Sequence, residues 1–185
     1  MTPDEILAVS RRATCLHTEA EVEEAIDVLA AKVSTALRDQ NPLLLCLMNG
    51  GLVFTGKLLT RLDFPLQIDY LHATRYRNNT QGSELDWHRL PMLPLDGRNV
   101  LIIDDILDEG ETLAAVVEHC RAHRAASVLT AVLVDKLHER KVADICADFV
   151  GLRVEDRYLY GYGMDYRGYL RNAAGIYAVD PVDCD

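Results

Sequence analysis

The sequence lacks three features that mark common classes of protein. It has no basic run, and its net charge is −10, which excludes a nucleic-acid binder that works by neutralising phosphates. Its five cysteines form no CxxC pair, so we interpret them as reduced packing residues, as in cytoplasmic proteins. No apolar run reaches the roughly 20 residues that span a bilayer, and the polar N-terminus predicts no signal peptide. We therefore expect a cytoplasmic protein without a nucleic-acid or membrane partner.

The sequence also lacks internal repeats, low-complexity tracts and long linkers. Its 185 residues, of which 49% are hydrophobic and 26% charged, suffice for one domain with a substantial core. We therefore predict a single domain over residues 1–185. An anionic ligand of so acidic a chain needs a metal ion, or a local group of cations and amides, to offset the repulsion.

Hydrophobic periodicity predicts strands that alternate with helices. Thr18 and Glu21 form a capping-box pattern before apolar residues at helical spacing, and Asn41–Pro42 ends that helix. The segment 76–89 is polar and aperiodic, which is typical of a surface hairpin or of a lid, and we favour the lid. This order predicts an α/β fold with a mostly parallel central sheet flanked by helices. The expected helices lie at about 1–16, 22–37, 52–62 and 112–123, and the expected strands at 43–48, 66–75, 90–95, 99–104, 127–134, 148–154 and 175–179.

One stretch, Val100–Leu113, joins an apolar strand to three carboxylates and a glycine turn. The strand ends at Asp104 and Asp105, with Asp108 just beyond, and ligands of open α/β sheets bind at the carboxyl ends of strands. Paired carboxylates in such a place hold Mg²⁺ shared with a phosphorylated substrate, accept hydrogen bonds from vicinal hydroxyls, or form a solvated or ion-paired acidic turn. The residues alone leave these three alternatives open.

The residues after Asp108 resemble an anion-binding nest at a helix N-terminus. Gly110 and Thr112 offer backbone N–H groups and a hydroxyl there. Glu109 and Glu111 suit the positive end of the helix dipole, yet they repel a phosphate. Plain capping of the helix accounts for the two glutamates equally well, so the turn has two interpretations.

Two other strand ends carry residues of interest. The Asn49-Gly50-Gly51 turn follows the strand 43–48, and it is either a place where backbone closely approaches another group or a plain tight turn. Its spacing does not match a P-loop. Lys136 follows the strand 127–134 and, in a parallel sheet, lies on the same rim as Asp104. Its ammonium group pairs with an acid, donates to a ligand carbonyl, or points into solvent.

Val100–Leu113 resembles the phosphoribosyl-diphosphate (PRPP) signature of type I phosphoribosyltransferases. The shared pattern is four apolar residues, two acids, two apolar residues and then Asp-x-Gly-x-Thr. Residues 133–136, 148–151 and 160–166, together with Arg171, are similar to the hypoxanthine-guanine phosphoribosyltransferase family. The likeness extends from the Asn49–Gly51 turn to the last strand. It implies the type I phosphoribosyltransferase fold, with a small hood region beside the central sheet.

The resemblance implies roles for the residues of the acidic stretch. Asp104 and Asp105 would hold the ribose hydroxyls of PRPP and support a Mg²⁺ ion. Asp108 would exchange a proton with purine N7 as the general base or acid. Family members commonly have Thr or Ser where this chain has Glu109, so one hydroxyl ligand of the phosphate is missing here. The 5′-phosphate would lie in the loop of Asp108, Glu109, Gly110, Glu111 and Thr112.

The other implied roles concern pyrophosphate, the base and a second metal ion. Arg171 and the turn of Asn49, Gly50 and Gly51, where the family often has a non-proline cis peptide, would bind pyrophosphate. Asp165 would bind a second Mg²⁺ ion. Lys136 would donate to the purine 6-oxo group, which distinguishes it from a 6-amino group. The base would contact Lys136, Tyr158, the backbone of Leu159, and Asp165.

The implied function is purine salvage. A homodimer or homotetramer would transfer the 5-phosphoribosyl group from PRPP to N9 of hypoxanthine or guanine, giving IMP or GMP and pyrophosphate. Mg²⁺ would neutralise the leaving group, and nearby carboxylates would stabilise positive charge on the ribose ring. Two alternatives stay open: a xanthine-preferring relative, and a catalytically weak regulator on the same fold that senses PRPP or a nucleotide.

Overall fold

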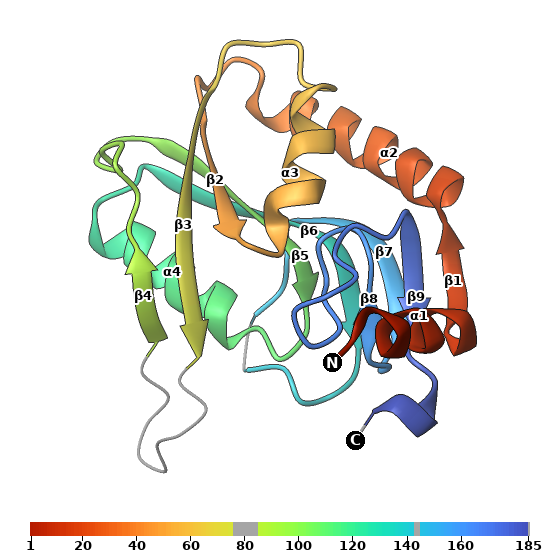
Figure 1. The fold of residues 1–185 in the computed structure, drawn as a ribbon. Helices are drawn as coiled ribbons and strands as arrows, with labels where there is room; N and C mark the ends of the chain where they lie inside the picture. The colour runs from red at the N-terminus through yellow and green to blue at the C-terminus, as the bar shows by residue number, and fades with distance from the viewer. Residues whose placement is uncertain (76–84, 143–144, 185) are drawn as a thin grey trace.

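A computed structural model shows a six-stranded sheet between helices and a three-stranded sheet beside it (Figure 1). The structure describes residues 1–75, 85–142 and 145–184. The helices are α1 (Pro3–Arg12), α2 (Glu19–Leu37), α3 (Gly51–Leu59), α4 (Glu111–Ala122) and the short 3₁₀ helix η1 (Pro181–Asp183). The strands are β1 (Thr14–Thr18), β2 (Leu43–Met48), β3 (Gln67–Arg75), β4 (Leu85–Arg89), β5 (Asn99–Leu107), β6 (Ser127–Leu137), β7 (Phe149–Glu155), β8 (Leu159–Tyr160) and β9 (Gly175–Ala178).

The large sheet has the strand order β4-β3-β2-β5-β6-β7. All neighbouring pairs are parallel except β3 and β4, so the predicted mostly parallel α/β sheet is confirmed. The chain runs from β2 outward to β3 and β4, and then returns to β5 on the other side of β2. The strand order therefore reverses between β2 and β5. A crevice forms at the carboxyl ends of two such strands, because their connections leave in opposite directions.

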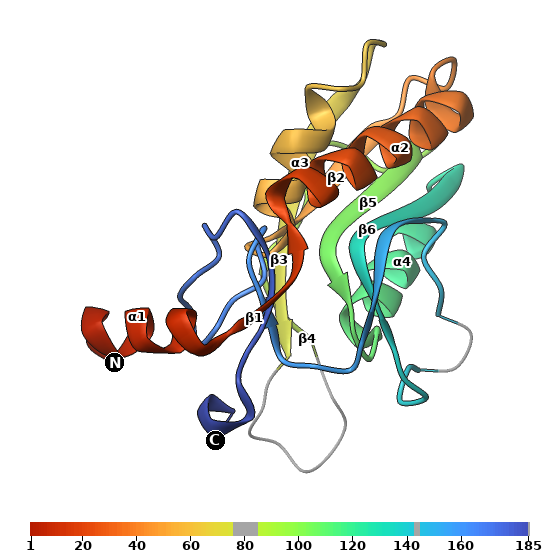
Figure 2. The same ribbon diagram turned by 90° about the vertical axis from the view of Figure 1, so that its right-hand side faces the viewer.

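Helices cover both faces of this sheet, as Figure 2 shows. On one face, α2 and α3 pack on side chains such as Leu44 and Ile103; on the other, α4 packs near Leu45 and Ile102. Successive residues of a strand point to opposite faces of the sheet. A strand that helices cover on both faces is therefore a continuous apolar run and not an alternating pattern. Leu44 and Leu45 are completely buried, and each such leucine contributes roughly 1.5–3 kcal/mol to folding.

The helix signals in the sequence are confirmed. Thr18 accepts a hydrogen bond from the backbone N–H of Glu21, and Glu21 in turn accepts one from the backbone N–H of Thr18. Helix α2 ends at Leu37, before the Asn41–Pro42 pair. The helix expected at about 112–123 forms as α4, and its buried face consists of Leu113, Val116, Val117 and Cys120.

A polar cluster ties α2 to α3. The carboxylate of Glu23 accepts from Lys57 at 2.7 Å, from Arg61 at 2.6 Å and from the hydroxyl of Tyr162 at 2.5 Å. Burial works to raise the pKa of Glu23, but these three donors outweigh it and lower the pKa to about 2. The ionised glutamate therefore stabilises the contact between the two helices.

The smaller sheet has the order β1-β9-β8 and is antiparallel. Helix α1 packs beside it through Ile6 and Val9. The predicted helix over 1–16 is thus wrong at its end, because residues 14–18 form β1. The strand expected at 175–179 forms as β9, but its place in the central sheet, which the predicted fold implied, is wrong, because β9 pairs with β1 and β8. Both strands belong to the small sheet that corresponds to the expected hood.

Two further predictions concern the region 76–95, and one of them, the strand over 90–95, is wrong. Residues 76–84 of the predicted lid lie outside the described residues, and 85–89 form β4, antiparallel to β3. The predicted strand over 90–95 is absent from the structure. Pro91 and Pro94 lack the N–H that a strand ladder needs. The backbone N–H groups of Met92 and Leu93 donate instead to the carboxylate of Asp69, at 2.6 and 2.8 Å.

Among the described residues, no helix is both long and apolar enough to cross a membrane.

Candidate active site

A cavity of about 670 Å³ opens at the carboxyl ends of β2 and β5, where the strand order reverses. It brings together most residues singled out from the sequence. Four of them, Gly51, Lys136, Tyr158 and Leu159, are not part of its lining. Sequence reasoning missed His72 and Ile106, which do line it. The predicted residues in the lining are Asn49, Gly50, Asp104, Asp105, Asp108, Glu109, Gly110, Glu111, Thr112, Asp165 and Arg171.

The turn after β2 passes very close to β5. Its first peptide bond, Met48–Asn49, is cis. A Cβ atom on Gly50 would collide with the carboxylate of Asp105, and one on Gly51 would lie 2.7 Å from the carbonyl oxygen of Ile103. Of the two interpretations of this turn, the close backbone approach is therefore confirmed. Glycine at both positions lets α3 begin directly against the acidic strand.

The acidic pair lies at the end of β5, which extends three residues beyond the predicted end, to Leu107. Asp105 is only 7% exposed, so a solvated acidic turn is wrong for this residue. The backbone N–H of Asp105 donates to Oδ1 of Asp104 at 2.9 Å. Burial raises the pKa of both carboxyl groups, and the charge of Asp105 pushes that of Asp104 well above its usual range. A cation brought into the cavity would offset this repulsion.

The loop after Asp108 has the backbone of a nest. Gly110 is the N-cap of α4 and has φ = +82°, a left-handed conformation that favours glycine. The carbonyl of Glu109 accepts from the backbone N–H of Val142 at 2.8 Å, and its carboxylate lies 3.9 Å from Nε of Arg140. The arginine thus offsets part of the charge that Glu109 brings to this loop.

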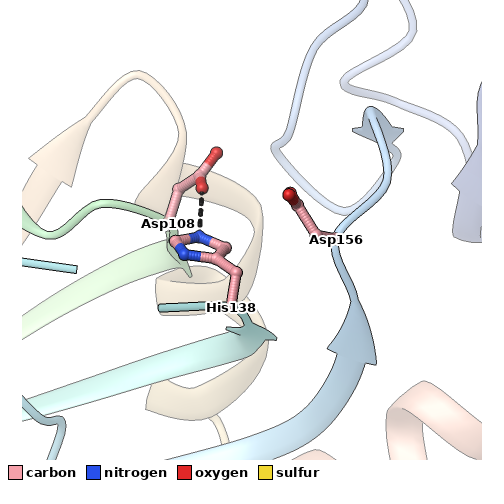
Figure 3. Close-up of side chains that lie close together, drawn as sticks. All are labelled: Asp108, His138 and Asp156. Carbon is pink, nitrogen blue, oxygen red and sulfur yellow. Dashed lines mark hydrogen bonds and ion pairs between the residues drawn. The ribbon is translucent and has the colours of Figure 1, made fainter. Parts of the chain in front are cut away.

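A group of charged side chains adjoins the cavity at Asp108. Nζ of Lys136 donates to Oδ2 of Asp108 at 2.8 Å and lies 3.7 Å from Asp156. Nε2 of His138 lies 2.8 Å from Oδ1 of the same aspartate (Figure 3). Lys136 is only 8% exposed, so a solvated lysine is wrong, and pairing with an acid is confirmed. Burial acts to raise the pKa of Asp108, but the hydrogen bonds from Lys136 and His138 prevail and lower it.

His138 and Asp156 were not predicted from the sequence. Each follows the end of a strand: β6 ends at Leu137, and β7, its parallel neighbour, ends at Glu155. His138 stands two residues after Lys136, the spacing that places two side chains of a strand on one face. That spacing was a usable signal for His138. Asp156 had none, because only the register between β6 and β7 brings it to this group.

Arg171 and Asp165 form an ion pair in the lining of the cavity, at 2.6 Å. Arg171 also donates to the carbonyl of Gly163 at 2.6 Å, and Asp165 accepts from the backbone N–H of Gly168 at 2.6 Å. The two side chains are therefore held in place by the loop that follows β8. Arg171 is the one predicted pyrophosphate ligand with a positive charge.

Tyr158 and Leu159, predicted to contact a base, lie outside the cavity lining. Leu159 is buried in β8, paired with Ala178. The hydroxyl of Tyr158 accepts from the backbone N–H of Arg167 at 3.1 Å, and its ring lies 5.5 Å from that of Tyr166. These contacts do not test a role in base binding, which stays a prediction.

Comparison with known proteins decides the family. Residues 13–166 match the phosphoribosyl transferase domain family. The chain is 36% identical over 167 residues to the hypoxanthine-guanine phosphoribosyltransferase of Bacillus subtilis, covering 90% of this chain and 92% of that protein. It belongs to the hypoxanthine-guanine phosphoribosyltransferase family. The hypoxanthine-guanine-xanthine phosphoribosyltransferase of Tritrichomonas foetus is 31% identical over 157 residues, covering 85% of this chain and 86% of that protein.

A solved phosphoribosyltransferase structure agrees with the fold. The hypoxanthine phosphoribosyltransferase of Staphylococcus aureus superposes with a TM-score of 0.87 at 28% identity, covering 93% of this chain and 94% of that chain. The type I phosphoribosyltransferase fold expected from the sequence, with its mostly parallel sheet and its hood, is confirmed.

The oxygen ligands in the cavity suit a magnesium ion of the kind phosphoribosyltransferases use. Carboxylates are hard donors, and Mg²⁺ needs only one or two of them when waters and substrate phosphates complete its shell. Asp104 and Asp105 meet this requirement, because both line the cavity and are adjacent at the end of one strand. Asp165 supplies a separate carboxylate in the same lining, although Oδ1 is paired with Arg171 and Oδ2 accepts from the backbone N–H of Gly168.

Proposed function

We propose that this protein is a purine salvage enzyme. It transfers the 5-phosphoribosyl group from PRPP to N9 of hypoxanthine or guanine, forming IMP or GMP and releasing pyrophosphate. The observation that carries the proposal is the Lys136–Asp108 pair at the edge of the cavity, 2.8 Å apart. A 6-oxopurine presents a carbonyl and N7 on one edge of its ring, and the pair offers a donor for the first and a base for the second.

The other residues of the cavity suit the sugar and its phosphates. Asp104 and Asp105 accept hydrogen bonds from the ribose hydroxyls and stabilise positive charge that develops on the ring. The 5′-phosphate lies against the N-terminus of α4, in the loop from Asp108 to Thr112. Arg171 and the Asn49–Gly51 turn bind pyrophosphate. All of these groups except Gly51 line the same cavity, which supports their joint use.

Mg²⁺ is the expected cofactor. When bound, the ion neutralises charge on the departing pyrophosphate. Asp104 and Asp105 would hold one ion, and Asp165 would hold a second. The chain itself positions PRPP, orients the base through Lys136, and keeps Asp108 ready to accept the proton at N7.

A side-by-side assay tests the proposal. Hypoxanthine, guanine, xanthine and adenine are each incubated with PRPP and Mg²⁺, and nucleotide and pyrophosphate are quantified. We expect turnover of hypoxanthine or guanine and little of adenine, because a 6-amino group leaves the ammonium of Lys136 unpaired. No turnover of any 6-oxopurine would refute the proposed activity.

A xanthine-preferring enzyme is the second candidate, because the relative from Tritrichomonas foetus is named for all three 6-oxopurines. Faster turnover of xanthine than of hypoxanthine and guanine in the same assay would favour it. Tight binding of PRPP or a nucleotide without turnover would instead indicate a regulator on this fold.

We also propose that the chain acts as a single domain and assembles into a homodimer or homotetramer in the cytoplasm. The family resemblance supports the assembly, and the absence of disulfides among the five cysteines, all of them free, is consistent with a reducing compartment. Light scattering on the purified protein would distinguish a monomer from either oligomer.

A further inference from the structure

The proton position on His138 follows from its two hydrogen bonds. Nδ1 lies 3.1 Å from the backbone N of Arg140, which carries a hydrogen and donates it. A ring nitrogen that accepts a hydrogen bond bears no proton, so the proton of the neutral ring is on Nε2. Nε2 lies 2.8 Å from Oδ1 of Asp108 and therefore donates to it. The side chain of His138 is only 5% exposed, so the imidazole is shielded from water, whereas the side chain of Asp108 is 43% exposed.

The two oxygens of Asp108 consequently have different partners. Oδ2 accepts from Lys136, and Oδ1 accepts from His138. In the reaction proposed above, the ammonium of Lys136 turns to the 6-oxo group of the base, which frees Oδ2. In this scheme His138 makes no hydrogen bond to the base, so its Nε2–H continues to donate to Oδ1 of Asp108. A carboxylate held at one oxygen cannot rotate freely about its Cβ–Cγ bond.

We propose that His138 is a positioning residue, which holds one oxygen of Asp108 so that the other faces purine N7. This inference rests on the proposed function, since it assigns Asp108 the proton transfer. A group held in the orientation that a reaction needs avoids the cost of finding it in each turnover. The imidazole itself touches neither substrate nor reacting atoms in this scheme.

The charged groups around His138 leave little room for another interpretation. His138, Asp108 and Asp156 offer ligand atoms within 4.8 Å of one another, an arrangement that is compatible with a metal ion. Each carboxylate already faces a cation of the chain, however. Lys136 forms an ion pair with Asp108 at 2.8 Å, and Arg140 donates to Asp156 at 2.6 Å. Glu109 faces the same Arg140, at 3.9 Å, so each of the three acids of this group has a cation of the chain within 4 Å.

Two substitutions separate the hydrogen bond from the bulk of the ring. His138→Leu removes the donor, whereas His138→Gln keeps an N–H in nearly the same place. We expect His138→Leu to lower kcat roughly tenfold or more while KM for PRPP stays unchanged, and His138→Gln to restore most of the rate. His123→Gln, on the exposed end of α4, is the matched control and should behave as the unaltered protein.

The dependence of kcat/KM on pH gives a second measurement, which should not change if His138 has only a structural role. Loss of a donor to the carboxylate raises the pKa of Asp108, so the acidic limb of the kcat/KM profile should move to higher pH in His138→Leu, by about 0.5–1 unit. In His138→Gln the limb should stay near its original place. Full kcat with an unmoved limb in His138→Leu, or a Gln variant as slow as the Leu variant while both are folded, would overturn the proposal.

Nitrogen NMR of the unaltered protein tests the same inference without any variant. Long-range ¹H–¹⁵N spectra at neutral pH should show His138 as the neutral tautomer with its proton on Nε2. A proton on Nδ1 would overturn the proposal even if the enzyme is active. Failure of the unaltered protein to convert any 6-oxopurine is a separate result, which refutes the proposed function and not the hydrogen-bond geometry.

Discussion

Replacement of Lys136 by methionine isolates the group that we expect to select the base. The side chain of Lys136 is 10% exposed, and its ammonium contacts Asp108 at 2.8 Å and Asp156 at 3.7 Å. Methionine has a similar length and no charge, so it fills the space without the donor. The variant therefore loses the hydrogen bond to a 6-oxo group and no longer leaves a buried charge unpaired beside a 6-amino group.

The expected size of the effect follows from the energy of one charge-assisted hydrogen bond. Such a bond contributes about 1.5–3 kcal/mol, and each 1.4 kcal/mol is tenfold, so kcat/KM for hypoxanthine should fall roughly 12- to 140-fold. For adenine the loss should be smaller, because the unaltered protein gains no such bond with it. The ratio of the two values should therefore fall by about one to two orders of magnitude.

The assay is steady-state turnover of hypoxanthine and adenine at saturating PRPP, compared with Lys32→Met as the matched control. Lys32 lies on the exposed face of α2 and is not part of the cavity lining, so its loss should leave both rates unchanged. Equal losses for the two bases would show that Lys136 supports the site in general and does not read the 6-position. An unchanged ratio would thus refute the reasoning.

Three other predictions address catalysis, packing and charge. Asp108→Asn should reduce kcat by roughly two to four orders of magnitude if Asp108 transfers the proton, and single-turnover kinetics at saturating base would measure the loss. Gly51→Ala should lower the free energy of unfolding by about 1–3 kcal/mol, because its Cβ would lie 2.7 Å from the carbonyl oxygen of Ile103. In the same helix, a Cβ atom on Gly56 would meet nothing within 4 Å, so Gly56→Ala should raise the free energy of unfolding by about 0.5–1 kcal/mol. Urea titrations in which both variants change stability in the same direction would contradict the packing argument. Glu23→Gln should cost on the order of 1–2 kcal/mol at pH 7, because the ionised carboxylate has a pKa lowered to about 2 by its three donors. A depressed pKa gives stability that is present above the unfolded value and lost as pH falls toward 2, so the difference from the unaltered protein should shrink between pH 4.5 and 2 in thermal melts.

Local patterns in the sequence were sufficient for most of the sheet and its helices. The capping box at Thr18, the apolar run of β2 and the buried face of α4 depend on residues a few positions apart, so they can be read from the chain directly. Predictions that depended on pairing between residues far apart in the sequence were wrong. The residues around Gly175 carry no local signal that β9 pairs with β1 rather than with a strand of the central sheet. Pro91 and Pro94 are local signals against a strand over 90–95.

Local patterns placed the chemical groups of the site: three carboxylates at a strand end, a glycine loop at a helix start and a lysine on the same rim. The partners of these groups could not be read from those patterns and are seen in the folded chain. The parallel register of β5, β6 and β7 places Asp108, Lys136 and Asp156 together, and it adds His138 on the second oxygen of Asp108. Hydrogen bonds between side chains depend on distances of about 3 Å, and strand register, unlike sequence spacing, sets these distances.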